Sequence, residues 1–313
     1  MKTQLITVLL SMALTVPVSA REYSVRVTLH VVDDEGRSIN GADAGVSFVR
    51  EYARKESERV TTARDVTDVH GMVTLEGKTA EAGISYGAQK EGHYKLGGAN
   101  YQFTSRGYFR LLPWNPTIEV VLKRIKSPVP MYAKRVKKGP PVIGETVRYD
   151  LQAGDWLAPH GKGKVADMLL IGKLHENGDR VYDWTMKLTF SNPGDGIQRF
   201  KPEPDFMRFR SPYEAPEDGY VSEWNLERTR RGPKVMEQTN YDETGGYFYR
   251  VRTVLDKDGK VVKALYGKIY GEIFFNMVHY LNPEGTRNME YDPNRNLLNP
   301  PTNWDRSYYE VGP

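Results

Sequence analysis

Apolar and polar residues alternate with a period of two along most of the chain after residue 21, as they do in half-buried β-strands. The pattern is clearest in Tyr23–Val32 and Thr117–Leu122. Further along, Val165–Leu174 and Val181–Phe190 flank an Asn-Gly pair, which is a strong hairpin signal. No segment shows a sustained helical period. The sequence therefore predicts an all-β protein.

The pattern is interrupted between residues 125 and 144, where prolines and like charges collect. This composition is typical of an extended linker. With 313 residues the chain is long enough for two domains. We therefore expect two β-sandwich-like domains in tandem, residues 21–124 and 145–313, joined by a linker at 125–144. The last thirty residues are rich in Asn, Pro and Tyr and predict an irregular C-terminal tail.

The first twenty residues have the pattern of a secretory signal peptide. Lys2 precedes an apolar stretch from Leu5 to Val16, and Val18 and Ala20 place small residues before a cut after Ala20. The apolar stretch is too short to span a bilayer, and no later stretch is apolar enough to do so. We therefore expect residues 1–20 to be removed on export.

Composition excludes several classes of chemistry. The chain has no cysteine, so disulfides, zinc–cysteine sites, iron–sulfur clusters and thiol catalysis are excluded. The net charge of +4 is too even for a typical nucleic-acid-binding protein. Export without disulfides or a glycosylation sequon favours the bacterial periplasm or exterior.

Residues 24–124 resemble the carboxypeptidase-regulatory-like domain, a transthyretin-like β-sandwich. The resemblance rests on Val32–Ala42, on the Thr67–Leu75 turn and strand, and on Lys90–Tyr94. Its glycines, such as Gly71, fall where a tight reversal requires a positive φ. The resemblance implies a structural or binding module without catalytic residues of its own. Residues 125–313 resemble no characterised family.

One loop in the second domain has the composition of a binding site: Asp155, Trp156, His160, Lys162 and Lys164, separated by glycines. Tryptophan offers an apolar face to a sugar ring, and the polar side chains offer directional hydrogen bonds. Glycines would let the backbone approach a ligand closely. The alternative is a plain connector with Trp156 buried in the core.

The sequence contains no complete motif for catalysis or for binding a metal or a cofactor. The Gly83–Gly87 match to a nucleophile elbow lies in a strand pattern without a following helix. The six histidines never fall in a zinc-ligand spacing, and no acid stands at a motif position. We therefore expect no metal and no cofactor.

Three functions remain open from the sequence. The favoured one is an exported, non-enzymatic binding or accessory protein of the bacterial envelope, with a polysaccharide or an envelope protein as its partner. The alternatives are an exported glycoside or peptide hydrolase with its active site in the second domain, and a structural component of a surface assembly.

Overall fold

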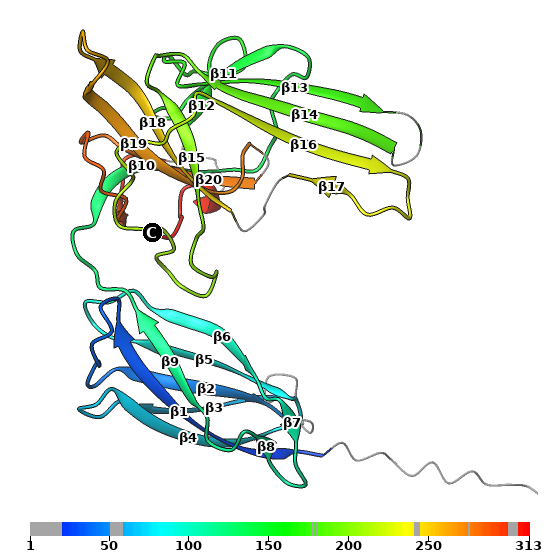
Figure 1. Ribbon diagram of the computed structural model, residues 1–313, viewed down its shortest axis with the longest axis vertical. Helices are drawn as coiled ribbons and strands as arrows, with labels where there is room; N and C mark the ends of the chain where they lie inside the picture. The colour runs from blue at the N-terminus through cyan, green and yellow to red at the C-terminus, as the bar shows by residue number, and fades with distance from the viewer. Residues whose placement is uncertain are drawn as a thin grey trace, which may run out of the picture. The chain divides into compact units, whose positions relative to one another are not determined.

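The computed structural model describes residues 21–50, 59–176, 178, 181–240, 245–274, 276–299 and 306–313. The predicted signal peptide, residues 1–20, lies outside this part of the chain. The predicted all-β class is confirmed: the described residues form strands, with one short 3₁₀ segment, η2 (Arg306–Tyr308), as their helical element (Figure 1). None of the described residues belongs to a helix with the length and apolar character needed to cross a membrane.

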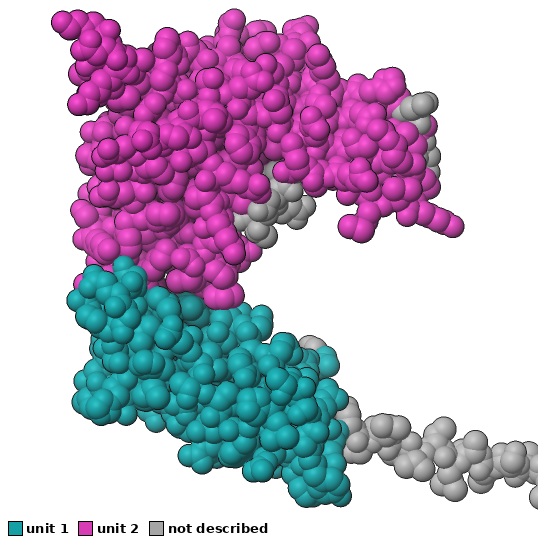
Figure 2. Space-filling model, viewed as in Figure 1, with its two compact units in different colours: residues 1–90, 96–122 teal, residues 91–95, 123–313 magenta. Residues whose placement is uncertain are grey.

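The chain divides into two compact units, which Figure 2 shows in different colours. Unit 1 comprises residues 1–90 and 96–122, and unit 2 comprises residues 91–95 and 123–313. Residues 91–95 were expected in the first domain. They belong to unit 2 because the ring of Tyr94 stacks on Phe209 with centroids 5.0 Å apart, and its hydroxyl donates to Glu290 at 2.9 Å.

Unit 1 is a β-sandwich of a three-stranded sheet, ordered β4-β1-β9, and a four-stranded sheet, ordered β3-β2-β5-β6, with a small β7-β8 ribbon. Its strands are β1 (Tyr23–Asp33), β2 (Asp43–Val49), β3 (Val60–Val66), β4 (Met72–Thr79), β5 (Gly83–Gln89), β6 (Leu96–Gln102), β7 (Ser105–Arg106), β8 (Leu111–Leu112) and β9 (Thr117–Leu122).

The two sheets of unit 1 touch where Phe48 of β2 lies against Gly77 of β4. A Cβ on Gly77 would stand 2.4 Å from the Phe48 ring, so the close approach requires glycine. Gly71, in the turn before β4, has φ +70°, as the sequence predicts. A Cβ there would also lie 2.6 Å from the Val31 carbonyl oxygen.

Unit 2 contains two six-stranded sheets, ordered β15-β18-β19-β20-β10-β21 and β12-β11-β13-β14-β16-β17. Its strands are β10 (Val129–Val136), β11 (Thr146–Asp150), β12 (Asp155–Trp156), β13 (Met168–Glu176), β14 (Val181–Phe190), β15 (Gly196–Phe200), β16 (Glu223–Arg231), β17 (Gln238–Thr239), β18 (Gly246–Leu255), β19 (Val261–Glu272), β20 (Asn276–Asn282) and β21 (Tyr291–Asn296). The predicted hairpin around the Asn-Gly pair is the antiparallel pair β13 and β14.

The apolar faces of these two sheets share one core. Tyr149, Leu170 and Leu188 from one sheet pack in the same buried cluster as Tyr249 and Ile269 from the other. The alternation seen in the sequence thus places one side of each strand in this core.

The predicted linker at 125–144 is wrong for residues 129–136, which are a strand of unit 2. Residues 129–136 form β10, which pairs antiparallel with β20 and parallel with β21. Met131 and Ala133 are fully buried. The prolines that suggested a linker are compatible with a strand because Pro128 precedes it and Pro130 lies at its start.

The C-terminal region is more ordered than its composition suggests. It contributes β21, and the side chain of Asn296 accepts a hydrogen bond from the Ala133 N–H and donates to the carbonyls of Ala133 and Tyr309. Here the hydrogen bonds of the Asn296 side chain take the place of the backbone hydrogen bonds that a longer strand would make.

Candidate functional site

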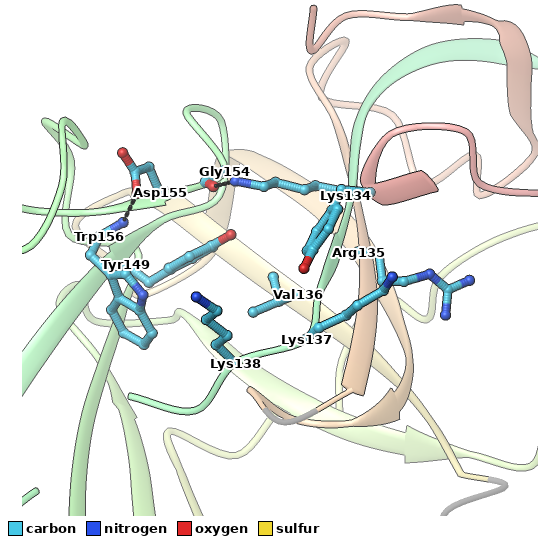
Figure 3. A pocket seen from close by; sticks show the side chains of 10 residues that line it. Lys134, Arg135, Val136, Lys137, Lys138, Tyr149, Gly154, Asp155 and Trp156 are labelled. Carbon is cyan, nitrogen blue, oxygen red and sulfur yellow. Dashed lines mark hydrogen bonds between the residues drawn. The ribbon is translucent and has the colours of Figure 1, made fainter. Parts of the chain in front are cut away.

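Unit 2 contains a cavity of about 260 Å³ at the end of β10 (Figure 3). We call it the cationic cavity, because four of its side chains carry positive charge. It is lined by Lys134, Arg135, Val136, Lys137, Lys138, Tyr149, Gly154, Asp155, Trp156 and Tyr308. Asp155 is the single carboxylate in this lining.

Aromatic side chains form one wall of the cationic cavity. Trp156 is half-buried and packs on Tyr149 and Phe274, with ring centroids 5.1 and 5.0 Å apart. Tyr149 is itself fully buried, so it fixes the indole in place. The result is a rigid ring face that is partly open to solvent. Such a face suits a flat, weakly polar surface such as one side of a sugar ring.

Basic side chains from β10 and the residues after it form the other wall. Figure 3 shows the Lys138 amine facing the Trp156 and Tyr149 side, whereas the Arg135 guanidinium points away from Trp156. The Lys134 amine donates to the Gly154 carbonyl at 2.5 Å, and the Lys137 amine lies 4.5 Å over the Tyr308 ring. Among the described residues, Arg135 and Lys138 have no ion-pair partner. These two charges are therefore available to an anionic ligand.

Burial affects the titration of two groups at this site. It lowers the pKa of Lys134 from its usual value, an effect that the nearby Asp155 carboxylate partly opposes. Behind the cavity, burial lowers the pKa of His279 to about 3, with a smaller contribution from Lys134. His279 is thus neutral at physiological pH, and its Nε2 lies 3.3 Å from the Tyr149 hydroxyl. Positive charge at the site comes from lysine and arginine alone.

The structure separates the five residues that the sequence singled out. Asp155 and Trp156 line the cationic cavity. His160, Lys162 and Lys164 do not, and all three are exposed. The loop is neither of the two sequence alternatives: Trp156 is partly exposed as a binding site needs, but the loop's other polar side chains do not converge beside it.

The loop is closed by its own acidic side chains. The Asp155 carboxylate accepts hydrogen bonds from the Trp156 and Lys162 N–H groups, both at 2.9 Å. The Asp150 carboxylate accepts from the N–H groups of Lys164 at 2.9 Å and Val165 at 3.1 Å. Burial alone would raise the pKa of Asp150, but these and other backbone N–H groups outweigh it and lower the pKa.

The glycines of the loop allow its backbone to fold closely against itself. A Cβ on Gly161 would stand 2.3 Å from the Trp156 carbonyl oxygen and 2.6 Å from the Asp155 carboxylate. A Cβ on Gly163 would lie 2.8 Å from the Asp155 carbonyl oxygen. The close approach that glycine permits is therefore to the loop's own backbone and not to a ligand.

Sequence reasoning missed the basic wall. Lys134, Arg135, Lys137 and Lys138 were assigned to the linker, although the signal was present: the buried positions Met131 and Ala133 alternate with period two directly before them. That alternation marks a strand whose end carries the charges.

Comparison with known proteins gives little further guidance. The chain matches no known protein family and no curated protein. Among solved structures it is similar to a mutant of the shaft pilin SpaA from Lactobacillus rhamnosus GG, at 13% identity and a TM-score of 0.24, over 56% of this chain and 90% of the pilin. It is also similar to BcpA, the major pilin subunit of Bacillus cereus, at 10% identity and a TM-score of 0.23, over 85% of this chain and 99% of that one. TM-scores this low do not establish a shared fold.

Proposed function

We propose that this protein is a non-enzymatic binding protein of the bacterial envelope whose unit 2 holds carboxylated glycans at the cationic cavity. The observation that carries the proposal is the pairing of a fixed, half-exposed indole, Trp156, with the unpaired charge of Lys138 across one small cavity. A sugar ring with a carboxylate presents both complementary features: an apolar face for the indole and an anion for the amine.

The charge balance of the lining supports an acidic ligand over a neutral one. The lining contains four cationic side chains and one carboxylate, and Asp155 is already engaged by two backbone N–H groups. In a partly enclosed site, a charge-assisted hydrogen bond contributes more than a neutral one. The cavity is small compared with sites for drug-sized ligands, so it fits a single residue of a glycan and not a large branched epitope.

The hydrolase alternative receives less support from the same lining. Glycoside hydrolysis generally requires two carboxyl groups across the scissile bond. Among side chains, the cationic cavity has the carboxylate of Asp155 alone, and two other described cavities of unit 2 have one carboxylate side chain each, Glu176 and Asp205. We therefore favour binding over catalysis.

Export and the role of unit 1 belong to the same proposal. The signal-peptide pattern of residues 1–20 would deliver the chain to the periplasm or the exterior, where envelope glycans are found. For unit 1, the resemblance to the carboxypeptidase-regulatory-like domain suggests a supporting module without a catalytic role.

The test is a calorimetric titration of the purified mature protein with a galacturonic acid trisaccharide. The matched control ligand is the same trisaccharide as its methyl ester, which keeps the sugar rings and removes the charge. We expect the ester to bind at least about tenfold more weakly, which corresponds to the loss of one charge-assisted hydrogen bond. Lys138→Ala should weaken binding of the acid form and leave the ester unaffected. Equal binding of acid and ester, or binding of neither, would overturn the proposal.

A second candidate function, a structural component of a surface assembly, has one observation in its favour. β3 is an edge strand of the four-stranded sheet in unit 1, and its Val60 and Val66 are more than half exposed. An exposed edge strand with apolar side chains is a template for pairing with another strand. If the protein assembles in this way, light scattering should show concentration-dependent oligomers that Val66→Lys abolishes. A monomer at all concentrations would exclude this route.

A further inference from the structure

The exposed aromatic side chains of the described residues all belong to one short segment of unit 1. Of the phenylalanines, tyrosines and tryptophans that the structure describes, three are exposed: Tyr108 to 74%, Phe109 to 66% and Trp114 to 37%. Tyr108 and Phe109 form the turn between β7 and β8, at the end of the sandwich where β1 begins (Figure 1). We call these three residues the aromatic tip. Exposed aromatic rings that collect in one place indicate an interaction surface.

The backbone holds the aromatic tip in place. The Gly107 N–H donates to the Arg110 carbonyl at 2.8 Å and closes the turn. The Ser24 N–H of β1 donates to the Phe109 carbonyl at 2.9 Å, which ties the turn to the sandwich. The Tyr108 and Phe109 rings lie edge to face with centroids 4.2 Å apart. The two rings are therefore held away from the core of unit 1.

Three exposed arginines belong to the same end of unit 1, Arg21, Arg106 and Arg110. The Arg21 guanidinium lies 4.1 Å over the Tyr108 ring, and the Arg110 guanidinium lies 5.5 Å over the Trp114 ring. Among the residues that the structure describes, none of the three arginines has an ion-pair partner. Their positive charge is therefore available beside the rings.

The hairpin and its flanks have no acidic residue to balance this charge. Residues 92–118 contain neither aspartate nor glutamate. Glu22, which follows Arg21, is paired with Arg50 at 2.7 Å. The surface thus combines apolar rings with positive charges that the described acids do not pair. A complementary partner presents negative charge next to an apolar layer.

We propose that the aromatic tip docks on a membrane surface that contains anionic phospholipid. Tryptophan and tyrosine rings are enriched at the membrane–water interface, and arginine binds phosphate through paired hydrogen bonds. Since Arg21 and Arg110 lie against the rings, their guanidiniums would reach the phosphates when the rings enter the interface. This inference goes beyond the proposed function and does not depend on it.

The size and shape of the aromatic tip favour a lipid surface over other partners. Its three rings expose about 350 Å² in all. A stable protein interface buries about 800 Å² on each partner. Two rings that meet edge to face also present no flat platform for a sugar. Attachment to a membrane needs only a small apolar area, because attraction to anionic lipid adds to it.

The experiment measures co-sedimentation of the mature protein with vesicles of phosphatidylcholine alone and of an equimolar mixture of phosphatidylcholine and phosphatidylglycerol. We expect the protein to bind the mixed vesicles at least about tenfold more strongly. Tyr108→Ser with Phe109→Ser should reduce binding to the mixed vesicles at least about tenfold. The matched control is Val69→Ser, an exposed apolar residue of the turn before β4, where the Gly71 carbonyl accepts from Val31 near the other end of β1. It should change binding less than about twofold.

A second pair of variants tests the charge. Arg106→Gln with Arg110→Gln should remove most of the preference for phosphatidylglycerol. Lys257→Gln with Lys260→Gln removes the same charge from an exposed turn of unit 2 and should keep that preference. All the substituted side chains are exposed, so the melting temperatures should match that of the wild type and show that each variant folds.

Several results would overturn the inference. The wild type would fail to bind the mixed vesicles, or would bind both kinds of vesicle equally. The variants of the aromatic tip would bind as the wild type does, or their losses would be no larger than those of the controls, which would indicate general charge attraction. Release of the protein from the vesicles by soluble glycerol phosphate would assign the arginines to a small phosphate ligand instead of a membrane.

Discussion

Two short segments of unit 2 carry lysines and have different structures. Residues 155–164 combine one acid, a histidine, two lysines and two glycines in a loop, and residues 134–138 combine four basic residues at the end of β10. In the loop, Asp155, together with Asp150 at the end of β11, accepts hydrogen bonds from the loop's N–H groups, and Lys162 and Lys164 are exposed. At the end of β10, residues up to Val136 pair with β20, and the Lys138 side chain has no ion-pair partner among the described residues.

The difference shows that a suggestive composition identifies a site only when the backbone's hydrogen bonds are satisfied elsewhere. In this loop, polar side chains accept hydrogen bonds from the loop's own N–H groups. The end of a strand obtains backbone hydrogen bonds from the neighbouring strands.

Arg252→Ala should disrupt the base of the loop. The guanidinium donates to both carboxylate oxygens of Asp167, at 2.8 and 3.0 Å, and to Asp150 at 3.1 Å. Both acids are buried, so removal of the arginine leaves two buried carboxylates without their counter-charge. We expect the free energy of unfolding, measured by urea titration, to fall by about 3–5 kcal/mol. Arg148→Ala, an exposed arginine on β11, should cost less than about 0.5 kcal/mol; equal losses would contradict this role of Arg252.

Trp156→Ala should affect both stability and binding. The indole packs on Tyr149 and Phe274 but remains partly exposed, so its removal should cost about 2–3 kcal/mol, below the usual range for emptying a core site. Thermal unfolding and glycan titration on the same folded variant measure the two effects. Lost stability with unchanged binding would make Trp156 a core residue only.

Gly161→Ala should strain the loop and leave the basic wall intact. Its Cβ would contact the Trp156 carbonyl oxygen at 2.3 Å, and a backbone contact cannot be relieved by rotating a side chain. We expect a loss of about 1–3 kcal/mol in unfolding free energy. Gly172→Ala is the control, because the nearest atom to its Cβ would be 4.0 Å away. A loss at Gly172 as large as that at Gly161 would show that the loop is not specifically strained.

The sequence predicted the class of the fold well and the site only in part. The alternation of apolar and polar residues, as in β1 and β14, is a local property of the sequence. It can therefore be recognised without knowing which strands pair. The role of residues 134–138 depends on β20 and β21, which lie about 150 residues further along the chain. Asp155 and Trp156 were predicted from the composition of their loop, and the structure places both in the lining of the cationic cavity.

Lys268 is a basic residue whose burial costs stability, in contrast to the exposed lysines of the cationic cavity. Its amine is fully buried, lies 4.7 Å over the Phe209 ring and donates to the Ser211 hydroxyl at 3.1 Å. Burial lowers its pKa well below the usual value. At pH values between the lowered pKa and about 10.4, the unfolded chain binds a proton that the folded protein lacks. Stability should therefore rise with pH across this window.

Lys268→Met should remove that rise and stabilise the protein at neutral pH by on the order of 1 kcal/mol, since the amine's desolvation is lost together with one hydrogen bond. Urea titrations at pH 7 and pH 9 on both proteins measure the change. If wild-type stability falls from pH 7 to pH 9 and the variant follows the same course, Lys268 does not titrate as described.

The central claim is that the basic end of β10, and not the glycine-rich loop, binds the ligand. The most direct test compares two double variants of equal charge. One combines Lys137→Ala with Lys138→Ala, and the other combines Lys162→Ala with Lys164→Ala. Each is titrated with the galacturonic acid trisaccharide. All four lysines are exposed, so both variants should fold. The account predicts at least a tenfold loss of affinity for the β10 pair and less than a twofold change for the loop pair. A larger loss for the loop pair would contradict it.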